Sequence, residues 1–557
     1  MLGRMTNTTT PPLHGYGELD RLMGLMTGDE KHGPAATSTL DVLWVLYDRV
    51  LRVSPATAGS PGRDRFLLSK GHGPMAYYAV LAARGFFDEE LLSGFGAYDS
   101  PLGHHPDRLL VPGAEIGSGS LGHGLPLAVG SVLGLRAQGL TEPRVWVLTG
   151  DAELDEGSNH EAIAYAGPAG LEQLNTVVID NASATYARPG GIAARFEAAG
   201  WSASTVDGRD HDALYAAFTA PHPGRPHAVI ARWHPAAEHP ARPSGPDTTP
   251  NTSEDTPMDT MRDRFIATTT RLLDEDPRIA VVLAEISRDG FGPAERAHPH
   301  RVVNVGIREQ LLIGAGAGMA LTGMRPVMHT FASFLVERPF EQVKLDLGHQ
   351  GVGGVLVSAG ASYDWPAGGF THMAPGDVAL LDTLDGWTVH VPGHPDEAET
   401  LLRRSVRGDG RVYVRLSLQS NRAARAVGGP GFETVRRGDG GGVVIAVGPM
   451  LDNVLEATEG LDVTVLYATT VRPFDAASLR RAAGAHGTTG VVLVEPFLAG
   501  TSTAAANDAL TDLPHRILGL GVGRSELRRY GQMPDHLVAH GLDPRSLRQR
   551  ITGFLHP

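Results

Sequence analysis

The sequence contains no cysteine, only three lysines (Lys31, Lys70 and Lys344), and no long apolar run. The absence of cysteine excludes disulfide bonds, thiolate metal sites and a cysteine nucleophile. No apolar stretch reaches the roughly 18 residues that a transmembrane helix needs. The N-terminal residues also lack the apolar core of a signal peptide, so we expect a cytoplasmic protein.

Positive charge is in deficit, because 48 Lys and Arg residues oppose 62 Asp and Glu residues, a formal net charge of −14. A surface of this sign attracts neither nucleic acid nor anionic membranes, so we expect no partner of either kind. Any anionic substrate must therefore be held by local groups. The 557 residues are 42% hydrophobic and 20% charged, which is typical of a globular protein. This length predicts about three or four domains.

Two stretches of the chain predict linkers. Residues 236–257 are dense in Pro, Ser, Thr and acidic residues and have no apolar period. Residues 422–439 are rich in Gly, Arg and Pro and separate two regions with apolar patterns. These cuts predict three domains, at residues 1–235, 258–421 and 440–557.

Short runs of β-branched and apolar residues alternate with longer helical patterns in each predicted domain. The clearest runs are residues 145–148, 176–179, 279–283, 355–357, 443–447 and 491–494. Continuous apolar strands between amphipathic helices predict mainly parallel sheets covered by helices on both faces. The predicted fold class is therefore α/β, with three such domains. In open sheets of this kind, ligands bind beyond the carboxyl ends of the strands.

Two oxygen-bearing side chains follow neighbouring strands of the first domain. Asp151 comes just after the run 145–148, and Asn181 comes just after the run 176–179. Two parallel strands joined by a helix would bring both side chains to one edge of the sheet. A carboxylate, an amide oxygen and a main-chain carbonyl suit Mg²⁺ or Ca²⁺. Taken alone, however, the pair fits a capping aspartate and an ordinary turn asparagine at least as well.

The surroundings of this pair carry a family resemblance. The segment GDAELDEGSNHEAIAYAGPAGLEQLNTVVIDNAS resembles the thiamine diphosphate signature of the transketolase family, which begins Gly-Asp-Gly and ends with an Asn. The resemblance implies that Asp151, Asn181 and the carbonyl of Ser183 hold the metal that binds the cofactor diphosphate. Gly150 and Ala152 would flank that diphosphate, and Ala152 replaces the usual glycine.

Other motifs of the first domain resemble the same family in the same order. They are KHGPAATSTLDVLWVLY, LSKGHGPMAYYAVLAARGFF, GHHPDR and EIGSGSLGHGLPLAVG. The resemblance places His32, His72, His105 and the Gly119-Ser120-Leu121 turn at the reaction centre. Histidines there can hold hydroxyl groups and relay protons near neutral pH.

The segment RVVNVGIREQLLIGAGAGMALTGMRPVMHTFASFLVERPFEQVKLDL resembles the pyrimidine-binding domain of the family. Glu309 matches the glutamate that bonds the aminopyrimidine ring of the cofactor and activates it. Its alternative interpretation is a charge that caps a helix N-terminus. Phe334 matches the aromatic residue that stacks on the pyrimidine, and Phe331 is its neighbour. Glu156 and Glu161 match buried acids that join Glu309 across a homodimer interface.

The third domain resembles the C-terminal domain of transketolases, and we assign no catalytic residue to it. The predicted substrate pocket departs from the family pattern. The motif GGFTH keeps His372 but has Gly368 in place of an aspartate that reads the donor. Gly360 stands where a phosphate-binding histidine is expected, and Leu418 replaces an arginine that contacts phosphate. Four other arginines are candidates to restore part of this binding: Arg262, Arg338, Arg422 and Arg425.

The resemblance implies a homodimeric enzyme that uses thiamine diphosphate and Mg²⁺ (or Ca²⁺). It would transfer a two-carbon ketol or related acyl unit from a ketose or 2-oxo acid to an aldehyde or ketone. The altered pocket favours an unphosphorylated or atypical substrate. One alternative is a pyruvate-using decarboxylase or deoxyxylulose phosphate synthase-like enzyme. Another is a non-catalytic homologue that serves as a binding partner, for which we would expect Asp151, Asn181 or Glu309 to be lost.

Overall fold

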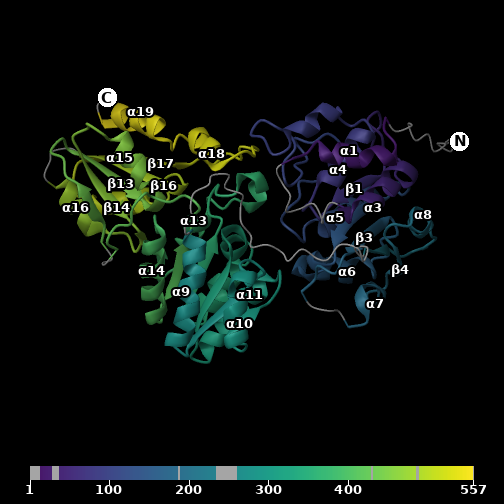
Figure 1. The fold of residues 1–557 in the computed structure, drawn as a ribbon, viewed down its shortest axis with the longest axis horizontal. Coiled ribbons are helices and arrows are strands. Elements are labelled where there is room, and N and C mark those ends of the chain that lie inside the picture. Colours follow the sequence, from purple (N-terminus) through teal and green to yellow (C-terminus); the bar gives the residue numbers. More distant parts are fainter. Residues whose placement is uncertain are drawn as a thin grey trace. The chain divides into compact units, whose positions relative to one another are not determined.

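The computed structural model describes residues 13–27, 37–185, 189–233, 260–427, 431–484 and 489–555. The chain divides into two compact units. Unit 1 contains residues 1–242 with the short segments 367–371 and 528–531, and unit 2 contains the rest. Figure 1 draws most of unit 1 in purple to blue and unit 2 in teal to yellow.

Unit 1 is built on a five-stranded, entirely parallel sheet with the strand order β1-β2-β3-β5-β4. Its strands are β1 (Arg65–Leu68), β2 (Val145–Gly150), β3 (Leu174–Asp180), β4 (Ser202–Asp207) and β5 (His227–Arg232). Its α-helices are α1 (Leu19–Gly24), α3 (Leu40–Val45), α4 (Met75–Ala83), α5 (Gly124–Ala137), α6 (Gly157–Ala166), α7 (Gly191–Ala198) and α8 (His211–Phe218).

Helices cover both faces of this sheet because successive apolar side chains of a strand point in opposite directions. Phe66 and Leu68 pack with α1, α3, α4 and α8, whereas Leu67 packs with α5, α6 and α7. The neighbouring strands follow the same alternation, with Trp146 on the first face and Val147 on the second. In open parallel sheets, ligands bind at the edge where the strands end.

The first sheet of unit 2 has seven strands in the order β15-β10-β11-β9-β8-β6-β7, and all but β15 run parallel. Its strands are β6 (Ile279–Leu283), β7 (Val302–Asn304), β8 (Arg325–Phe331), β9 (Gly354–Ala359), β10 (Trp387–His390), β11 (Arg411–Arg415) and β15 (Thr470–Arg472). The helices around it are α9 (Met261–Glu275), α10 (Arg288–Ala297), α11 (Glu309–Leu321), α12 (Phe340–Gln342), α13 (Asp377–Leu381) and α14 (Pro395–Arg407). Two π-helical segments, η6 (Ser333–Glu337) and η7 (Val343–His349), follow β8.

The second sheet of unit 2 has five strands in the order β12-β14-β13-β16-β17, and only β12 runs antiparallel to its neighbour. Its strands are β12 (Glu433–Arg436), β13 (Gly442–Val447), β14 (Val463–Ala468), β16 (Thr489–Leu498) and β17 (His515–Val522). Its helices are α15 (Leu451–Ala457), α16 (Ala476–Ala483), α17 (Thr503–Ala509), α18 (Met533–His540) and α19 (Pro544–Leu555).

The predicted α/β class with mainly parallel sheets is confirmed, and each predicted apolar run lies within a strand. The second and third predicted domains nevertheless form one compact unit. The physical reason is a shared core, since Val389 and Val391 of the seven-stranded region pack in one cluster with Val443 and Val447 of β13. Strand β15 also joins the seven-stranded sheet from the third region.

Of the two predicted linkers, the structure describes residues only of the second. Residues 422–439 include strand β12, so part of this stretch belongs to the second sheet of unit 2. Residues 236–257 lie outside the described part of the chain. The domain boundaries therefore stay predictions. Within the described ranges, no helix combines the length and the apolar character needed to cross a membrane.

Candidate active site

The predicted metal ligands of unit 1 lie side by side at the carboxyl edge of its sheet. Strands β2 and β3 are neighbours, with Gly150 opposite Ile179 in register. Asp151 therefore follows one strand where Asn181 follows the next, as the sequence predicts. The helix α6 between the two strands provides the crossover that parallel pairing requires.

Asp151 is almost fully buried, and the loop after β3 folds over its carboxylate. Oδ2 accepts hydrogen bonds from the backbone N–H groups of Ser183 at 2.8 Å and Ala184 at 3.1 Å. Oδ1 accepts from the N–H of Ala152 at 2.9 Å and from the Ser183 hydroxyl. Ala182 has a φ of 58°, a left-handed conformation that costs a non-glycine residue on the order of 1–2 kcal/mol. This strained turn brings Ser183 to Asp151.

Asn181 supplies the observation that tests whether a cation fits here. Its side-chain Oδ1 atom is buried and accepts no hydrogen bond within the described part of the chain. A buried carbonyl oxygen without a partner costs free energy, which a bound cation would recover. The Asn181 amide oxygen and the Asp151 carboxylate are hard oxygen donors of the kind that Mg²⁺ or Ca²⁺ prefers.

Glu153 connects the loops around this edge, a role that the sequence motifs did not reveal. Its Oε1 accepts hydrogen bonds from the Ser69 hydroxyl at 2.5 Å and from the Gly122 N–H at 3.0 Å. Its Oε2 accepts from the Gly150 N–H at 3.1 Å. Burial raises the pKa of this carboxyl group, and these three donors oppose the shift. Glu153 thus ties the ends of β1 and β2 to the turn before α5.

Lys70 is a second residue that the motifs missed, although its rarity in the sequence was a signal. Lys70 follows β1 in the chain and is buried. Its side chain runs past Gly150, where an added Cβ atom would lie 3.3 Å from the Lys70 Cδ. Burial lowers its pKa to about 8, while the charges of Glu153 and Asp151 act in the opposite direction. A buried cation beside this edge is suited to an anionic ligand.

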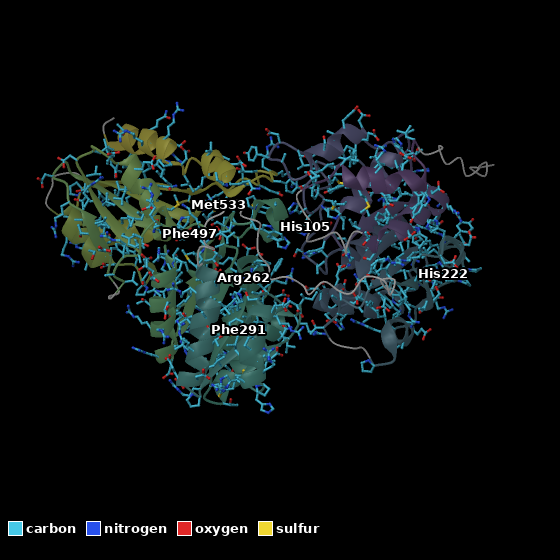
Figure 2. The ribbon with its side chains drawn as sticks, viewed as in Figure 1. His105, His222, Arg262, Phe291, Phe497 and Met533 are labelled. Atoms are coloured by element: carbon cyan, nitrogen blue, oxygen red, sulfur yellow. The ribbon has the colours of Figure 1, made fainter. Side chains whose placement is uncertain are left out.

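The predicted turn and two of the predicted histidines lie close together in unit 1. A Cβ atom on Gly119, whose φ is 127°, would lie 2.6 Å from the ring of His105 (labelled in Figure 2). The His105 ring is buried, and its centroid lies 4.7 Å from that of His72, edge to face. Ser120 and Leu121 are half-buried beside Gly119. His32 lies outside the described residues.

The two predicted acids of α6 differ in burial. Glu156 is buried just before α6 and packs on Gly122, where a Cβ atom would lie 2.6 Å from the Glu156 Cβ. Glu161 is exposed on α6 in the single chain. The sequence resemblance implied that both are buried, so burial of Glu161 would require another chain.

In unit 2, Glu309 opens α11 at the carboxyl edge of the seven-stranded sheet and is 2% exposed. Its Oε2 accepts a hydrogen bond from Nη1 of Arg338 at 2.9 Å. Among the described residues, none donates a hydrogen bond to Oε1. No side chain caps this helix. Since the carboxylate bonds a guanidinium and not the helix N–H groups, the geometry does not favour the helix-capping interpretation.

Four aromatic rings contact one another and reach the Arg338 guanidinium, and we call them the aromatic cluster: Phe331, Phe334, Trp365 and His372. The Phe334 ring lies 4.1 Å from the Arg338 guanidinium above it and 5.2 Å from the His372 ring. Trp365 stacks on Phe331 at 5.9 Å and meets His372 edge to face at 4.8 Å. Of these rings, Trp365 was not singled out by sequence reasoning, because it matches no family motif.

The arginines considered as replacement phosphate ligands are engaged in other contacts. Arg262, on α9 (Figure 2), donates through Nε to the Ser287 hydroxyl at 2.8 Å. Arg425 pairs with Glu433 at 2.5 Å. Arg422 is 83% exposed, and its guanidinium lies 3.6 Å from Asp452. Arg338 is held by Glu309, as described above.

The residues that depart from the family pattern also have structural consequences. Gly360 has a φ of 63°, and a Cβ atom there would lie 2.9 Å from Cδ1 of Phe331. No side chain can therefore stand at Gly360 while Phe331 keeps its place. Leu418 is exposed, and its N–H donates to the buried carboxylate of Asp364 at 3.0 Å.

Comparisons with known proteins agree with this geometry. Residues 25–232 match the family model of the transketolase thiamine diphosphate binding domain, and residues 259–423 match that of the transketolase pyrimidine binding domain. The chain is 55% identical over 292 residues to an uncharacterized 33.6 kDa protein in the fasciation locus of Rhodococcoides fascians, covering 52% of this chain and 93% of that protein.

Two further relatives carry transketolase names. The chain is 35% identical to one of the apulose-4-phosphate transketolase chains of Actinobacillus succinogenes, over 36% of this chain and 75% of that protein. It is 24% identical to the mouse transketolase-like protein 2, over 93% of this chain and 92% of that protein. Two domain models in family order, with relatives along the whole length, lead to one conclusion: the chain belongs to the thiamine diphosphate-dependent transketolase family.

Proposed function

We propose that the protein transfers a two-carbon ketol or related acyl unit from a ketose or 2-oxo acid donor to an aldehyde or ketone acceptor. The observation that carries this proposal is the buried Glu309 carboxylate, which has one oxygen held by Arg338 and the other not bonded by any described residue. The presence of Asp151 and Asn181 at the edge of the other sheet supports it.

Thiamine diphosphate, when bound, supplies the electron sink that lets a bond next to a carbonyl group break and form. Asp151, Asn181 and the Ser183 carbonyl would hold a Mg²⁺ (or Ca²⁺) ion at its diphosphate end, with Gly150 and Ala152 alongside. These residues would bind and orient the diphosphate, and the buried edge of the sheet would exclude water from it.

In unit 2, Glu309 would exchange a proton with the aminopyrimidine ring through Oε1, while Arg338 fixes the carboxylate through Oε2. Phe334 would stack on that ring. His72, His105 and His372, together with His32, would exchange protons with the hydroxyl and carbonyl groups of the substrates. His72 and His105 are in ring contact, so they can act on the same substrate region.

An unphosphorylated or otherwise atypical substrate fits the pocket best. A phosphate group is normally held by charge-assisted hydrogen bonds worth about 1.5–3 kcal/mol each. Arg338 and Arg425 are paired with carboxylates, and Gly360 leaves no room for a histidine. The name of the Actinobacillus relative refers to a sugar phosphate, which supports a sugar-like substrate here but not the absence of phosphate.

We also propose that the protein is a homodimer in which the cofactor is shared between chains. Large apolar side chains are exposed on helices that flank the two candidate edges. They are Leu127 and Leu133 of α5, Tyr165 of α6, and Leu311 and Leu321 of α11. Exposed apolar side chains gathered on a few helices are typical of a protein interface.

The test is a donor panel with purified protein, thiamine diphosphate and Mg²⁺. Xylulose 5-phosphate, fructose, hydroxypyruvate and pyruvate are compared by mass spectrometry of products and CO₂. We expect hydroxypyruvate or free ketose to react fastest, and Glu309→Gln to lower kcat by at least about a hundredfold. Turnover of pyruvate alone would favour the decarboxylase alternative. Fastest turnover of the sugar phosphate would refute the atypical substrate, and no turnover of any donor would favour a non-catalytic binding partner.

A further inference from the structure

A cavity of about 660 Å³ lies at the carboxyl edge of the unit 1 sheet, where β4 leads into α8. Four of its lining residues, 209–212, make the turn between these two elements, which are labelled in Figure 1. The others are Tyr16 of η1 (Tyr16–Glu18), Asp41 of α3 and Arg49 of η3 (Leu46–Val50). Pockets for small molecules usually measure about 300–1,000 Å³, so this cavity has the size of a ligand site.

Asp41 is held by two hydrogen-bond donors from separate elements. Its Oδ1 accepts from the Tyr16 hydroxyl at 2.6 Å and from Nε2 of His211 at 2.8 Å. The Tyr16 and His211 rings also meet edge to face, with 4.8 Å between their centroids. Burial and the bond to Asp41 raise the pKa of Tyr16, so its hydroxyl keeps its proton and remains a donor. The Asp41 carboxylate is therefore partnered within the protein.

The other two carboxylates of the cavity are also bonded within the protein. Oδ1 of Asp210 accepts from the N–H groups of Asp212 and Ala213 at 3.1 and 3.0 Å, which caps α8. Oδ1 of Asp212 accepts a hydrogen bond from Nη1 of Arg49 at 2.9 Å. Each acid in the lining thus has a partner, and a cationic ligand would have to compete with it.

The two arginines of the cavity keep N–H donors for a ligand. Among the described residues, Arg49 is bonded only through Nη1, and its partner Asp212 is 93% exposed, so this pair is a weak surface contact. Cζ of Arg209 lies 4.9 Å from the centre of the Trp233 ring, and no described residue accepts a hydrogen bond from its guanidinium. Stacking on Trp233 orients this group without using its N–H donors. Two guanidinium groups therefore line one cavity with donors to spare.

A phosphate monoester suits these donors better than a carboxylate does. One guanidinium fork can occupy both oxygens of a carboxylate, whereas three terminal phosphate oxygens can accept from two guanidinium groups at once. A phosphate monoester also carries a charge of about −1.5 to −2 at pH 7, which matches two cations. Inorganic phosphate would fill only a small part of the 660 Å³, so the volume favours a ligand with an organic part.

We propose that this cavity binds a small organic phosphate through Arg49 and Arg209, with the Tyr16 ring against its organic part. Tyr16 is 39% exposed and so keeps ring surface for such a contact. The site is separate from the predicted metal ligands Asp151 and Asn181, which follow β2 and β3, so its ligand is not the cofactor. Because the lining has three carboxylates and two guanidinium groups, we expect a modest affinity.

The test uses three ligands that share one ring and differ in the attached group: phenyl phosphate, benzoate and phenol. Each is titrated by calorimetry into the full chain saturated with thiamine diphosphate and Mg²⁺, so that the cofactor site is already filled. We expect phenyl phosphate to bind at least about tenfold more tightly than benzoate, a difference of about 1.4 kcal/mol. Phenol should not bind measurably, because it lacks the anionic group.

Arg209→Gln and Arg49→Gln should each weaken phenyl phosphate binding at least about tenfold, since each removes charge-assisted hydrogen bonds. Arg232→Gln is the matched control, because Arg232 is an exposed arginine of β5 that does not line the cavity. It should keep the affinity of the wild type. The Kd for thiamine diphosphate should stay unchanged in both cavity variants, since they leave the cofactor site intact.

Four results would overturn the proposal. Unchanged binding of phenyl phosphate in both cavity variants would place the ligand elsewhere, and an equal loss in Arg232→Gln would indicate a general effect of surface charge. Benzoate binding as tight as that of phenyl phosphate would contradict the assignment to a phosphate. If phenyl phosphate bound only to protein without thiamine diphosphate, the site would be that of the cofactor.

Discussion

Lys70 and Glu153 are a pair of buried ionisable residues that share one edge of the unit 1 sheet. Three hydrogen-bond donors stabilise the Glu153 carboxylate, and Lys70 lies close to both Glu153 and Asp151. A buried ammonium group is costly unless charges compensate it. A bound diphosphate would add such compensation, so Lys70 is positioned to stabilise it.

We therefore expect Lys70→Gln to weaken thiamine diphosphate binding by about tenfold or more, since a charge-assisted hydrogen bond contributes roughly 1.5–3 kcal/mol. Calorimetric titration of the cofactor in the presence of Mg²⁺ measures this change. Lys344→Gln is the matched control, because Lys344 is exposed on η7. An unchanged Kd in Lys70→Gln would assign Lys70 a purely structural role.

Glu495 of β16 is a second buried acid, with no exposed surface. Its Oε1 accepts from the Ser502 N–H at 3.1 Å, and its Oε2 has no hydrogen-bond partner among the described residues. Burial raises its pKa to about 7. The folded state therefore favours the protonated form, and the stability it contributes is fully present below the unfolded pKa of about 4.3. That contribution is lost as the pH rises through 7.

Glu495→Gln should remove this loss, because glutamine is neutral at every pH. We expect the variant to gain up to about 3 kcal/mol in free energy of unfolding at pH 8, and almost nothing at pH 4. Urea titrations of both proteins at the two pH values measure the difference. Glu341→Gln, at an exposed site, should show no such pH dependence. An equal gain at both pH values would contradict the assignment.

At the scale of the elements, the turn before α5 is a part of unit 1 that tolerates little change. Gly122 has a φ of 90°, its N–H donates to Glu153 at 3.0 Å, and Glu156 packs directly against it. This turn lets the Glu153 and Glu156 side chains approach the backbone from two sides. It therefore couples the strand end at Gly150 to α5.

Gly122→Ala should destabilise the protein by roughly 1–3 kcal/mol, since the added methyl group meets Glu156 and the backbone is left-handed. Differential scanning calorimetry measures this effect. Gly553→Ala is the control, because Gly553 lies in α19 and a Cβ atom there meets nothing within 4 Å. That substitution should be neutral or stabilise by up to about 1 kcal/mol. Equal melting temperatures for Gly122→Ala and the wild type would refute this account of the turn.

At the scale of the whole molecule, the exposed apolar side chains of α5, α6 and α11 support the proposed interface with a second chain. Helix α11 begins at the buried Glu309 and yet exposes Leu311 and Leu321. A helix that begins at a buried candidate catalytic residue and exposes apolar side chains is suited to an interface beside Glu309. Burial of Glu161 on α6 would follow from the same association.

We expect the wild-type protein to sediment at twice its chain mass of 58.9 kDa. Leu311→Arg should shift it toward the monomer, because a charge would be buried in the interface. Donor turnover should fall in parallel, since the cofactor would be shared between chains. Val538→Arg, at an exposed apolar site on α18, is the matched control. Analytical ultracentrifugation with activity measurements decides the question, and an active monomer would contradict the proposed dimer.

Sequence patterns predicted the strands of this protein correctly where burial determines the type of residue. The run 145–148 is buried on both faces of a parallel sheet, so its residues are uniformly apolar and its strand was predicted correctly. The positions of Asp151 and Asn181 followed from the same logic, because parallel neighbours end at one edge. By contrast, strand β12 was interpreted as part of a linker, since a short edge strand of mostly polar, half-buried residues has little apolar signal.

By itself, the sequence determined the α/β class, the order of the strands' apolar runs and the motifs that identify the family. Those properties depend on local periodicity and on short spacings. Only the tertiary structure decided that Glu153 ties three loops together, that Arg338 holds Glu309, and that Trp365 stacks on Phe331. Apart from the bond between Gly150 and Glu153, each of these contacts joins residues far apart in the chain, and no local pattern determines which distant side chains will meet.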